Sequence, residues 1–96
     1  MTMDGPDWYL YMVRCRGGSL YTGITTDVGR RFAEHNGGTG AKYLKGRGPL
    51  TLVFERKIGS RGLAASVEAR VKRLTKVEKE AMVRDEKLFK LLVSSI

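Results

Sequence analysis

The sequence predicts a single α+β domain in which helices flank a small, mixed three-stranded sheet, in the element order ββαβαα. Its 96 residues leave room for one core and exclude a second domain. Three segments show the β-branched, aromatic or alternating apolar residues of strands, and three others show the spacing of amphipathic helices. This order groups the helices beside a sheet, which is an α+β arrangement.

Strand signals occur at 8–15, 19–25 and 50–54. The first two segments are rich in β-branched, aromatic and apolar residues, and Arg-Gly-Gly at 16–18 separates them, which predicts a hairpin. The third segment alternates apolar with β-branched side chains and runs out near Lys57. We expect it to complete the sheet.

The length of the hairpin turn decides which side chains share a face of the sheet. With a three-residue loop, one face carries Tyr9, Tyr11, Tyr21 and Gly23. A two-residue Gly-Gly turn would separate them, and the sequence leaves both registers open. Gly23 lies in the middle of a strand, which indicates a bulge or close approach by another backbone or a ligand, with a simple bend as the alternative.

The first helix is expected to begin at Thr26 or Asp27, either of which can serve as its N-cap. It should end at the Asn-Gly-Gly segment 36–38. Arg31 and His35 lie one helical turn apart and are therefore neighbours on one flank of this helix. The alternative for both residues is ordinary surface decoration.

Two further helices and a short tail are expected after the third strand. Ser60 can cap a helix whose apolar stripe consists of Leu63, Val67, Val71 and Leu74. Residues 75–78 supply a capping box for the next helix, and residues 87–93 indicate a short amphipathic tail.

Glu68 lies at the margin of this apolar stripe on the helical wheel, so its side chain is expected at the edge of the packed face and not fully exposed to solvent. Its alternative role is an i, i+4 ion pair with Lys72, worth about 0.2–0.5 kcal/mol. The sequence offers no His or Cys cluster for a closed zinc site. Any metal would therefore be a hard, largely hydrated cation on one carboxylate, as Mg²⁺ tolerates.

The charge of the chain is strongly positive. Eighteen Lys and Arg against ten Asp and Glu give a formal net charge of +8, which attracts polyanions. Nucleic acid is the commonest such partner, with acidic lipid and plain solubility as alternatives. The glycine-rich segment 37–49 is expected to form a long surface loop, with Lys42, Lys45 and Arg47 as its basic rim.

Cysteine content and hydropathy indicate the cellular compartment in which the protein is expected. Cys15 is the single cysteine, so it cannot form an internal disulfide, and it is expected to fill space in the core. No apolar run approaches the ~20 residues that cross a bilayer, and the opening segment 1–7 carries acids where a secretory leader carries bases. We therefore expect a cytoplasmic protein without a membrane partner.

Together these motifs resemble the GIY-YIG nuclease superfamily, in particular its small stand-alone members related to the nuclease subunits that cut flaps and Holliday junctions. Trp8-Tyr9 is similar to the GIY segment, and Tyr21-Thr22-Gly23 is similar to YIG. The segment 27–36 is similar to the helix that bears the catalytic arginine of the family. The resemblance extends from about Trp8 to Leu74, which is most of the chain.

The resemblance implies a nuclease domain at residues 7–83 followed by a helical tail at residues 84–96. The implied activity is divalent-metal-dependent hydrolysis of DNA phosphodiester bonds by an endonuclease, selective for DNA structure and acting in DNA repair or recombination. The implied catalytic residues are Tyr9, Tyr21, Arg31, His35 and Glu68.

Each of these residues has an implied role. Glu68 would hold a single Mg²⁺ or Mn²⁺ ion, and Arg31 would neutralise charge that develops on the phosphate. Tyr21 or Tyr9 would orient or deprotonate the attacking water. His35 would relay the proton or brace Arg31.

Flanking phosphates would be bound by Lys42, Lys45, Arg47, Arg70, Arg73 and Lys76. Such contacts position DNA without reading its sequence, so recognition by shape, as in branched or flapped DNA, is expected. A protein partner could supply further specificity. The alternatives are a non-catalytic nucleic-acid-binding module that retains the nuclease scaffold, and a structural adaptor in repair assemblies.

Overall fold

The computed structural model describes residues 5–96; residues 1–4, part of the acidic opening segment, lie outside the described residues. The elements follow in the order β1 (Trp8–Arg14), β2 (Leu20–Thr25), α1 (Val28–Asn36), the 3-10 helix η1 (Lys42–Leu44), β3 (Thr51–Gly59), α2 (Arg61–Lys72), α3 (Lys76–Arg84) and α4 (Glu86–Ser94). The predicted α+β fold class is confirmed. The observed order is ββαβααα, and its last helix, α4, lies where the sequence indicated a helical tail.

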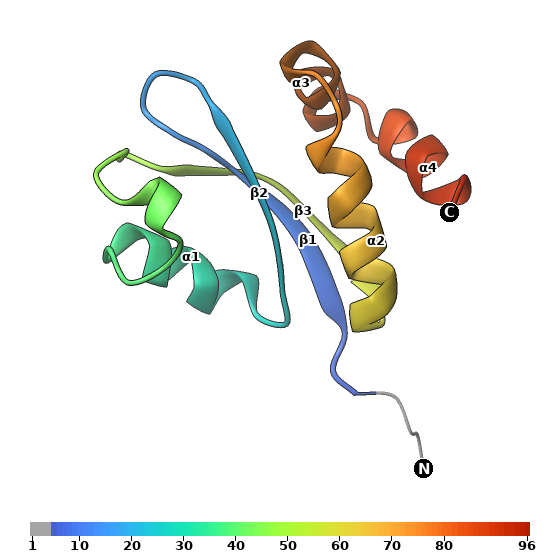
Figure 1. Ribbon diagram of the computed structural model, residues 1–96, viewed down its shortest axis with the longest axis horizontal. Coiled ribbons are helices and arrows are strands. Elements are labelled where there is room, and N and C mark those ends of the chain that lie inside the picture. Colours follow the sequence, from blue (N-terminus) through green and yellow to red (C-terminus); the bar gives the residue numbers. More distant parts are fainter. Residues whose placement is uncertain (1–4) are drawn as a thin grey trace.

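The sheet has the strand order β2-β1-β3, and β1 pairs antiparallel with both of its neighbours. The prediction of a mixed sheet is therefore wrong. β2 and β3 run in the same direction, but β1 lies between them, so the described strands contain no parallel pair. The chain travels from one edge of the sheet to the other through α1 and the loop that follows it (Figure 1).

The hairpin between β1 and β2 has a three-residue turn. The N–H of Cys15 donates to the carbonyl of Ser19 at 2.9 Å, which leaves residues 16–18 in the loop. Gly17 and Gly18 have φ angles of 92° and 99°, which side chains other than hydrogen rarely allow. Cys15 itself is buried and free, which agrees with the predicted place in the core.

This register places the tyrosines of the hairpin on one face of the sheet. Tyr11 lies opposite Gly23, and Tyr9 and Tyr21 belong to the same small core as Tyr11. Helix α1 and η1 cover this face, and Val28 of α1 packs into the core (Figure 1). Of the two registers that the sequence left open, the shared-face arrangement is the one observed.

The opposite face carries the larger core, covered by α2, α3 and α4 (Figure 1). In the predicted stripe of α2, Val67 and Val71 are fully buried. Leu63 is 38% exposed, however, and Ala64 is buried instead, so the stripe was predicted one residue out of place at its start. The buried core residues of this face are Leu10, Met12, Leu20, Phe54, Val67, Val71, Met82 and Phe89.

Helices α1, α2 and α3 begin at caps that the sequence predicted. Of the two caps considered for α1, Asp27 is the one used, and its side chain accepts a hydrogen bond from the N–H of Arg30 at 3.0 Å. Ser60 caps α2, and Thr75 with Glu78 forms the capping box of α3. Because each cap satisfies backbone N–H groups that a helix start leaves without partners, these boundaries are fixed locally.

The last strand and last helix differ from the sequence-based boundaries. β3 continues to Gly59, beyond the expected end near Lys57, because it pairs with β1 as far as Trp8. α4 contributes Phe89 to the core, with its ring centroid 5.1 Å from that of Phe54.

Within the described part of the chain, no helix combines the length and apolar character needed to cross a membrane.

Candidate active site

A buried hydrogen bond between β1 and α1 forms the centre of the candidate site. Tyr11 Oη and His35 Nε2 are 2.8 Å apart, and the two residues are only 1% and 3% exposed. A Cβ at Gly23 would lie 2.5 Å from Tyr11 Oη. Glycine is therefore required where the Tyr11 ring crosses β2. The close contact at Gly23 is made by a side chain of the protein itself, whereas the sequence had indicated another backbone or a ligand.

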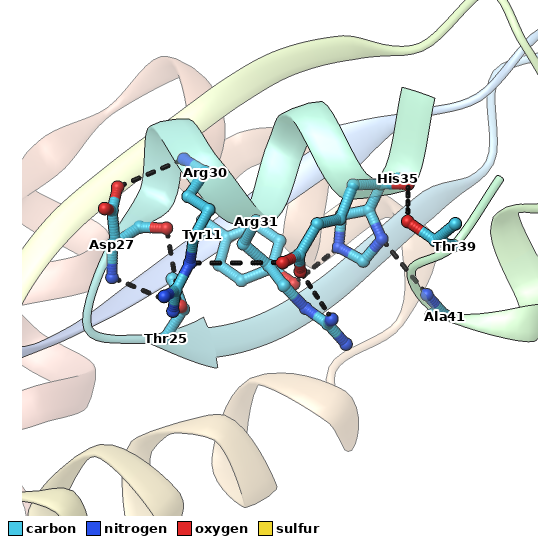
Figure 2. A network of polar contacts seen from close by, with 9 residues as sticks. Tyr11, Thr25, Asp27, Arg30, Arg31, His35, Thr39 and Ala41 are labelled. Atoms are coloured by element: carbon cyan, nitrogen blue, oxygen red, sulfur yellow. Dashed lines mark hydrogen bonds and ion pairs between the residues drawn. The ribbon is translucent and has the colours of Figure 1, made fainter. Parts of the chain in front are cut away.

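The second ring nitrogen of His35 is also bonded. The backbone N–H of Ala41, in the loop after α1, donates to His35 Nδ1 at 3.2 Å (Figure 2). This loop folds back on the last turn of α1, because the N–H groups of Thr39 and Gly40 both donate to the carbonyl of Glu34. His35 is thus held from both sides, by a strand and by a loop.

Tyr21 of β2 extends the site from this buried pair toward solvent. Its ring centroid lies 5.5 Å from that of His35 and 6.4 Å from that of Tyr11. It also stacks on Tyr43 of η1, with 6.0 Å between centroids, and Tyr43 is exposed. The guanidinium of Arg47 lies 4.2 Å from the centroid of the Tyr43 ring. Aromatic and basic groups therefore continue from the buried pair to the surface.

Tyr11 is a central residue that was not among the site residues predicted from sequence. It contacts His35, whereas Tyr9, which was among them, is half-buried against the small core. The signal that could have found Tyr11 was the register of the hairpin. A three-residue turn pairs Tyr11 with Gly23, and a glycine within a strand indicates that a neighbour comes close.

Arg31 lies on the same flank of α1 as His35, next to the Tyr11 hydroxyl (Figure 2). Its Nη1 donates to Glu34 Oε1 at 3.0 Å. The hydrogen bond with Glu34 raises the pKa of the guanidinium, and the neighbouring Tyr11 adds to this effect. The Arg31 side chain is 35% exposed, so an anion can reach it from solvent.

Burial sets the protonation states of the central pair. It raises the pKa of Tyr11 to about 12. The neighbouring Tyr21 adds to this effect, the hydrogen bond and positive charge of Arg31 oppose it, and Glu68 adds the smallest increase. Burial also lowers the pKa of His35; Arg31 lowers it further, and Glu34 acts in the opposite direction. At neutral pH, Tyr11 is therefore a phenol and His35 an uncharged ring.

Glu68 approaches the site from α2, at the margin of the packed face, as the helical wheel indicated. Its side chain is 23% exposed, and its Oε2 lies 3.2 Å from Lys72 Nζ. This is the ion pair that the sequence offered as its alternative role. The carboxylate is also close enough to Tyr11 to influence the pKa of that hydroxyl. Glu68 thus combines an ion pair with Lys72 and a negative charge that acts on the Tyr11 hydroxyl.

A hydrated metal ion fits the surroundings of Glu68. Within residues 5–96, no three His, Cys, Asp or Glu side chains gather into an enclosed metal site. An ion at Glu68 would therefore have one protein ligand and water in its other positions, which suits Mg²⁺ or Mn²⁺. The partner of Glu68 is an exposed lysine, so the carboxylate can exchange it for a cation.

The predicted phosphate-binding residues fall into two groups. Lys42, Lys45 and Arg47 are exposed on η1 and the residues after it, beside Tyr43. The other three lie at the C-terminal end of α2 and the start of α3. There Arg70 donates to Ser95 Oγ at 2.8 Å, Lys76 pairs with Glu80 at 2.6 Å, and Arg73 is exposed. Only the first group is brought next to the tyrosines.

A shallow groove of about 290 Å³ beside Tyr21 adds two lysines that were not predicted from sequence. Its lining residues come from β2, from η1 on one face of the sheet, and from α2 and α3 on the other. The groove therefore follows the outer edge of β2. No linear motif could have identified this set, because tertiary structure brings it together. The lining residues are Leu20, Tyr21, Thr22, Tyr43, Lys72 and Lys79.

Comparison with known proteins identifies the family to which the chain belongs. The GIY-YIG catalytic domain family matches residues 7–81. The UPF0213 protein YhbQ of Salmonella arizonae is 51% identical over 89 residues, which cover 93% of this chain and 89% of the relative. A UPF0213 protein of Cronobacter sakazakii is 53% identical, with coverage of 93% and 94%.

Two solved structures have a similar fold. The solution NMR structure of a UPF0213 protein from Bacillus halodurans has 45% identity and a TM-score of 0.54, covering 81% of this chain and 83% of that one. The solution NMR structure of a protein from E. faecalis has 39% identity and a TM-score of 0.60, with coverage of 86% and 88%. The chain therefore belongs to the GIY-YIG family, and UPF0213 proteins are among its relatives of similar length.

Proposed function

We propose that the protein is a divalent-metal-dependent endonuclease that hydrolyses phosphodiester bonds of DNA. One observation carries the proposal: Tyr11 of β1, Tyr21 of β2, and Arg31 and His35 of α1 come together, and the charge of Glu68 on α2 acts on the Tyr11 hydroxyl. Titratable groups whose pKa values are shifted by burial and by neighbouring charges are candidates for a functional site. Membership of a family defined by a catalytic domain supports the same conclusion.

Residues of α1 and of the sheet have separate roles at the phosphate and at the attacking water. Arg31 carries a permanent, partly exposed positive charge that would stabilise negative charge developing on the phosphate. Tyr11 keeps its proton at neutral pH, because its pKa is about 12, and therefore acts as a hydrogen-bond donor. Tyr21 is more exposed and is the better candidate to orient or deprotonate the attacking water.

Glu68 is the residue that would hold Mg²⁺ or Mn²⁺. Such an ion, when bound, supplies positive charge at the phosphate oxygens and lowers the pKa of coordinated water. Lys72 must release the carboxylate for this to happen. The pair is partly exposed, and pairs of that kind contribute about 0.2–1 kcal/mol, so the release costs little.

The basic surface suits DNA that is recognised by shape. Lys42, Lys45 and Arg47 lie on one side of the β2 edge, and Lys72 and Lys79 line the groove from the other side. Contacts from both sides to phosphates would position a strand without reading bases. We therefore propose branched or flapped DNA as the substrate, a role in repair or recombination, and a protein partner as a further source of specificity.

Incubation with a panel of DNA structures tests this proposal. Single-stranded, duplex, flapped and branched DNA would be compared with and without Mg²⁺ or Mn²⁺. We expect metal-dependent cleavage by the wild type, none by Glu68→Gln, and full cleavage by Glu55→Gln, which alters an exposed glutamate of β3. Cleavage that persists in Glu68→Gln would refute the role of Glu68 as the metal ligand.

A second candidate function is binding of nucleic acid without cleavage. The observation that favours it is the state of Glu68 and Tyr11: the carboxylate is paired with Lys72, and the phenol is protonated at neutral pH. In that case the wild type would bind DNA in the same panel but release no products with either metal. Glu68→Gln would then leave both affinity and products unchanged.

A further inference from the structure

The loop after α1 determines which nitrogen of His35 carries a proton. A backbone N–H can only donate a hydrogen bond, so the Ala41 N–H, 3.2 Å from Nδ1, requires a lone pair on Nδ1. An uncharged imidazole then carries its proton on Nε2. Because Nε2 lies 2.8 Å from Tyr11 Oη, the histidine donates this hydrogen bond and the tyrosine oxygen accepts it.

A charged His35 ring does not fit the same surroundings. A proton on Nδ1 would set two N–H donors against each other, one on the ring and one on Ala41. The ring is 3% exposed, and the guanidinium of Arg31 lies one turn away on the same helix. Burial and this positive charge both lower the pKa of His35, and only Glu34 opposes them.

The loop is held firmly enough to impose this state. The N–H groups of Thr39 and Gly40 donate to the carbonyl of Glu34 at 3.0 and 3.1 Å, which ties the loop to α1. Gly40 lies so close to the ring that a Cβ there would overlap His35 Nδ1. Figure 2 shows the ring between Tyr11 on one side and Ala41 on the other.

We propose that the Ala41 amide holds His35 as an uncharged ring protonated at Nε2, and that His35 is a positioning residue that turns the proton of the Tyr11 hydroxyl toward the substrate. The Tyr11 oxygen accepts from His35, so its own proton is free for an oxygen of a phosphate or a water. A proton relay through His35 would need Nδ1 as its exit, and Ala41 occupies that atom. The consequence for cleavage rests on the proposed function, whereas the position of the proton does not.

NMR spectroscopy of the free protein tests the position of the proton directly. His35 is the only histidine of the chain, so protein labelled with ¹⁵N in histidine and prepared without a histidine tag gives signals from one ring. Two-bond ¹⁵N–¹H correlations distinguish the two uncharged tautomers from each other and from the charged ring. We expect the Nε2–H tautomer at neutral pH. A dominant Nδ1–H tautomer, or a charged ring, would overturn the proposal whether or not the protein cleaves DNA.

The same spectrum tests the role of the loop. Gly40→Ala should displace the loop and produce a mixture of tautomers, because the added Cβ would overlap the ring. Gly62→Ala in α2 is the matched control, since its Cβ meets no atom within 4 Å. If the Gly40→Ala variant folds and its His35 ring keeps the wild-type tautomer, the loop does not set the tautomer. If the variant does not fold, the wild-type spectrum still shows which tautomer is present.

Cleavage by two variants at His35 tests the positioning role. His35→Gln keeps a side-chain N–H that can donate to Tyr11 but cannot titrate, whereas His35→Ala removes the donor. We expect the glutamine variant to stay within a few-fold of wild type and the alanine variant to lose roughly 10- to 100-fold, as when a hydrogen-bond partner of a reactive group is removed. Equal losses in both variants would show that the ring does more than donate. If wild type itself does not cleave, the proposed function fails and the tautomer result still stands.

Discussion

At the scale of single residues, Arg31 has a charge that does not depend on pH, and its guanidinium is bonded to Glu34 while remaining partly exposed. If it stabilises charge on the phosphate, Arg31→Ala should lower kcat about 10²- to 10³-fold, equivalent to about 2.7–4 kcal/mol. Arg31→Lys should recover little, because an ammonium cannot present two coplanar donors. Single-turnover cleavage at several pH values would measure both, with Arg30→Lys on the adjacent exposed position as control.

Full recovery of the rate by Arg31→Lys would contradict this prediction, since it would mean that charge alone is sufficient. A loss confined to acidic or alkaline pH would also contradict it. The guanidinium keeps its proton throughout the accessible range, because the hydrogen bond with Glu34 raises its pKa further. Its contribution should therefore be equal at every pH.

The three tyrosines should respond differently to replacement by phenylalanine. Tyr11 keeps its proton in the neutral range because its pKa is about 12, so Tyr11→Phe should lower the rate without changing the shape of the pH–rate profile. Tyr21→Phe should remove the ascending limb of the profile if Tyr21 is the base. Tyr9→Phe decides between Tyr9 and Tyr11: the larger loss identifies the tyrosine that acts beside His35, and we expect it for Tyr11. If all three variants keep the wild-type rate and pH–rate profile, the three hydroxyl groups have no role in cleavage and the rings serve only to pack the sheet.

The resemblance implied Arg31, His35 and Glu68 as site residues, and the residue pattern indicated only their local positions. Arg31 and His35 lie one helical turn apart, and Glu68 lies at the margin of a stripe. Tyr11 was not predicted because its partner depends on the register of the hairpin, which a one-residue difference in the turn would change. Lys79 could not be predicted, because it reaches the groove only after α3 packs against the sheet.

At the scale of elements, η1 and the residues after it carry exposed cations next to Tyr43, and Tyr43 stacks on Tyr21. Replacing Lys42, Lys45 and Arg47 together with Gln should flatten the dependence of log K on log salt by about 0.9 for each duplex phosphate that is no longer neutralised. Fluorescence anisotropy over a range of salt concentrations would measure this slope. Sequence preference should remain weak in all variants, because these cations bind phosphates and do not read bases.

The matched comparison replaces the second predicted group, Arg70, Arg73 and Lys76, with Gln. Two of these side chains already have partners, Ser95 for Arg70 and Glu80 for Lys76, so we expect a smaller change of slope. A larger change in this group than in the loop would move the path of the DNA toward the end of α2. An equal slope in wild type and both triple variants would exclude both surfaces.

The α+β class, the hairpin and the elements defined by local rules were predicted well, whereas the pairing of β3 was not. Caps at Asp27, Ser60 and Thr75 fix helix starts through hydrogen bonds within a few residues, which a sequence displays. The extension of β3 to Gly59 depends on pairing with β1, more than forty residues earlier in the chain. The same long-range pairing made the sheet antiparallel where a mixed sheet was predicted. Such pairings leave little trace in the pattern of a single segment.

At the scale of the whole molecule, ion pairs connect the sheet to the helices that cover its larger core. Arg14 at the end of β1 forms two hydrogen bonds with Glu80 of α3, at 2.6 and 2.8 Å, across 66 residues of sequence. Lys76 bonds the same carboxylate at 2.6 Å. Because Lys79 of α3 lines the groove beside Tyr21, this connection also positions part of the candidate site.

The pH dependence of stability should reveal this connection. The hydrogen bond from Arg14, then that from Lys76, lowers the pKa of Glu80 from an ordinary 4.5 to about 2 in the folded protein. A lowered folded-state pKa contributes stability that is present above the unfolded value and is lost as pH falls toward the folded value. Glu80→Gln should therefore lower Tm at neutral pH, and its difference from wild type should shrink between about pH 4.5 and 2. Thermal unfolding followed by circular dichroism measures this, and Glu86→Gln, which breaks the more exposed pair with Arg56, should have the smaller effect. A Glu80→Gln difference that stays constant with pH would mean that the carboxylate contributes by packing and not by charge.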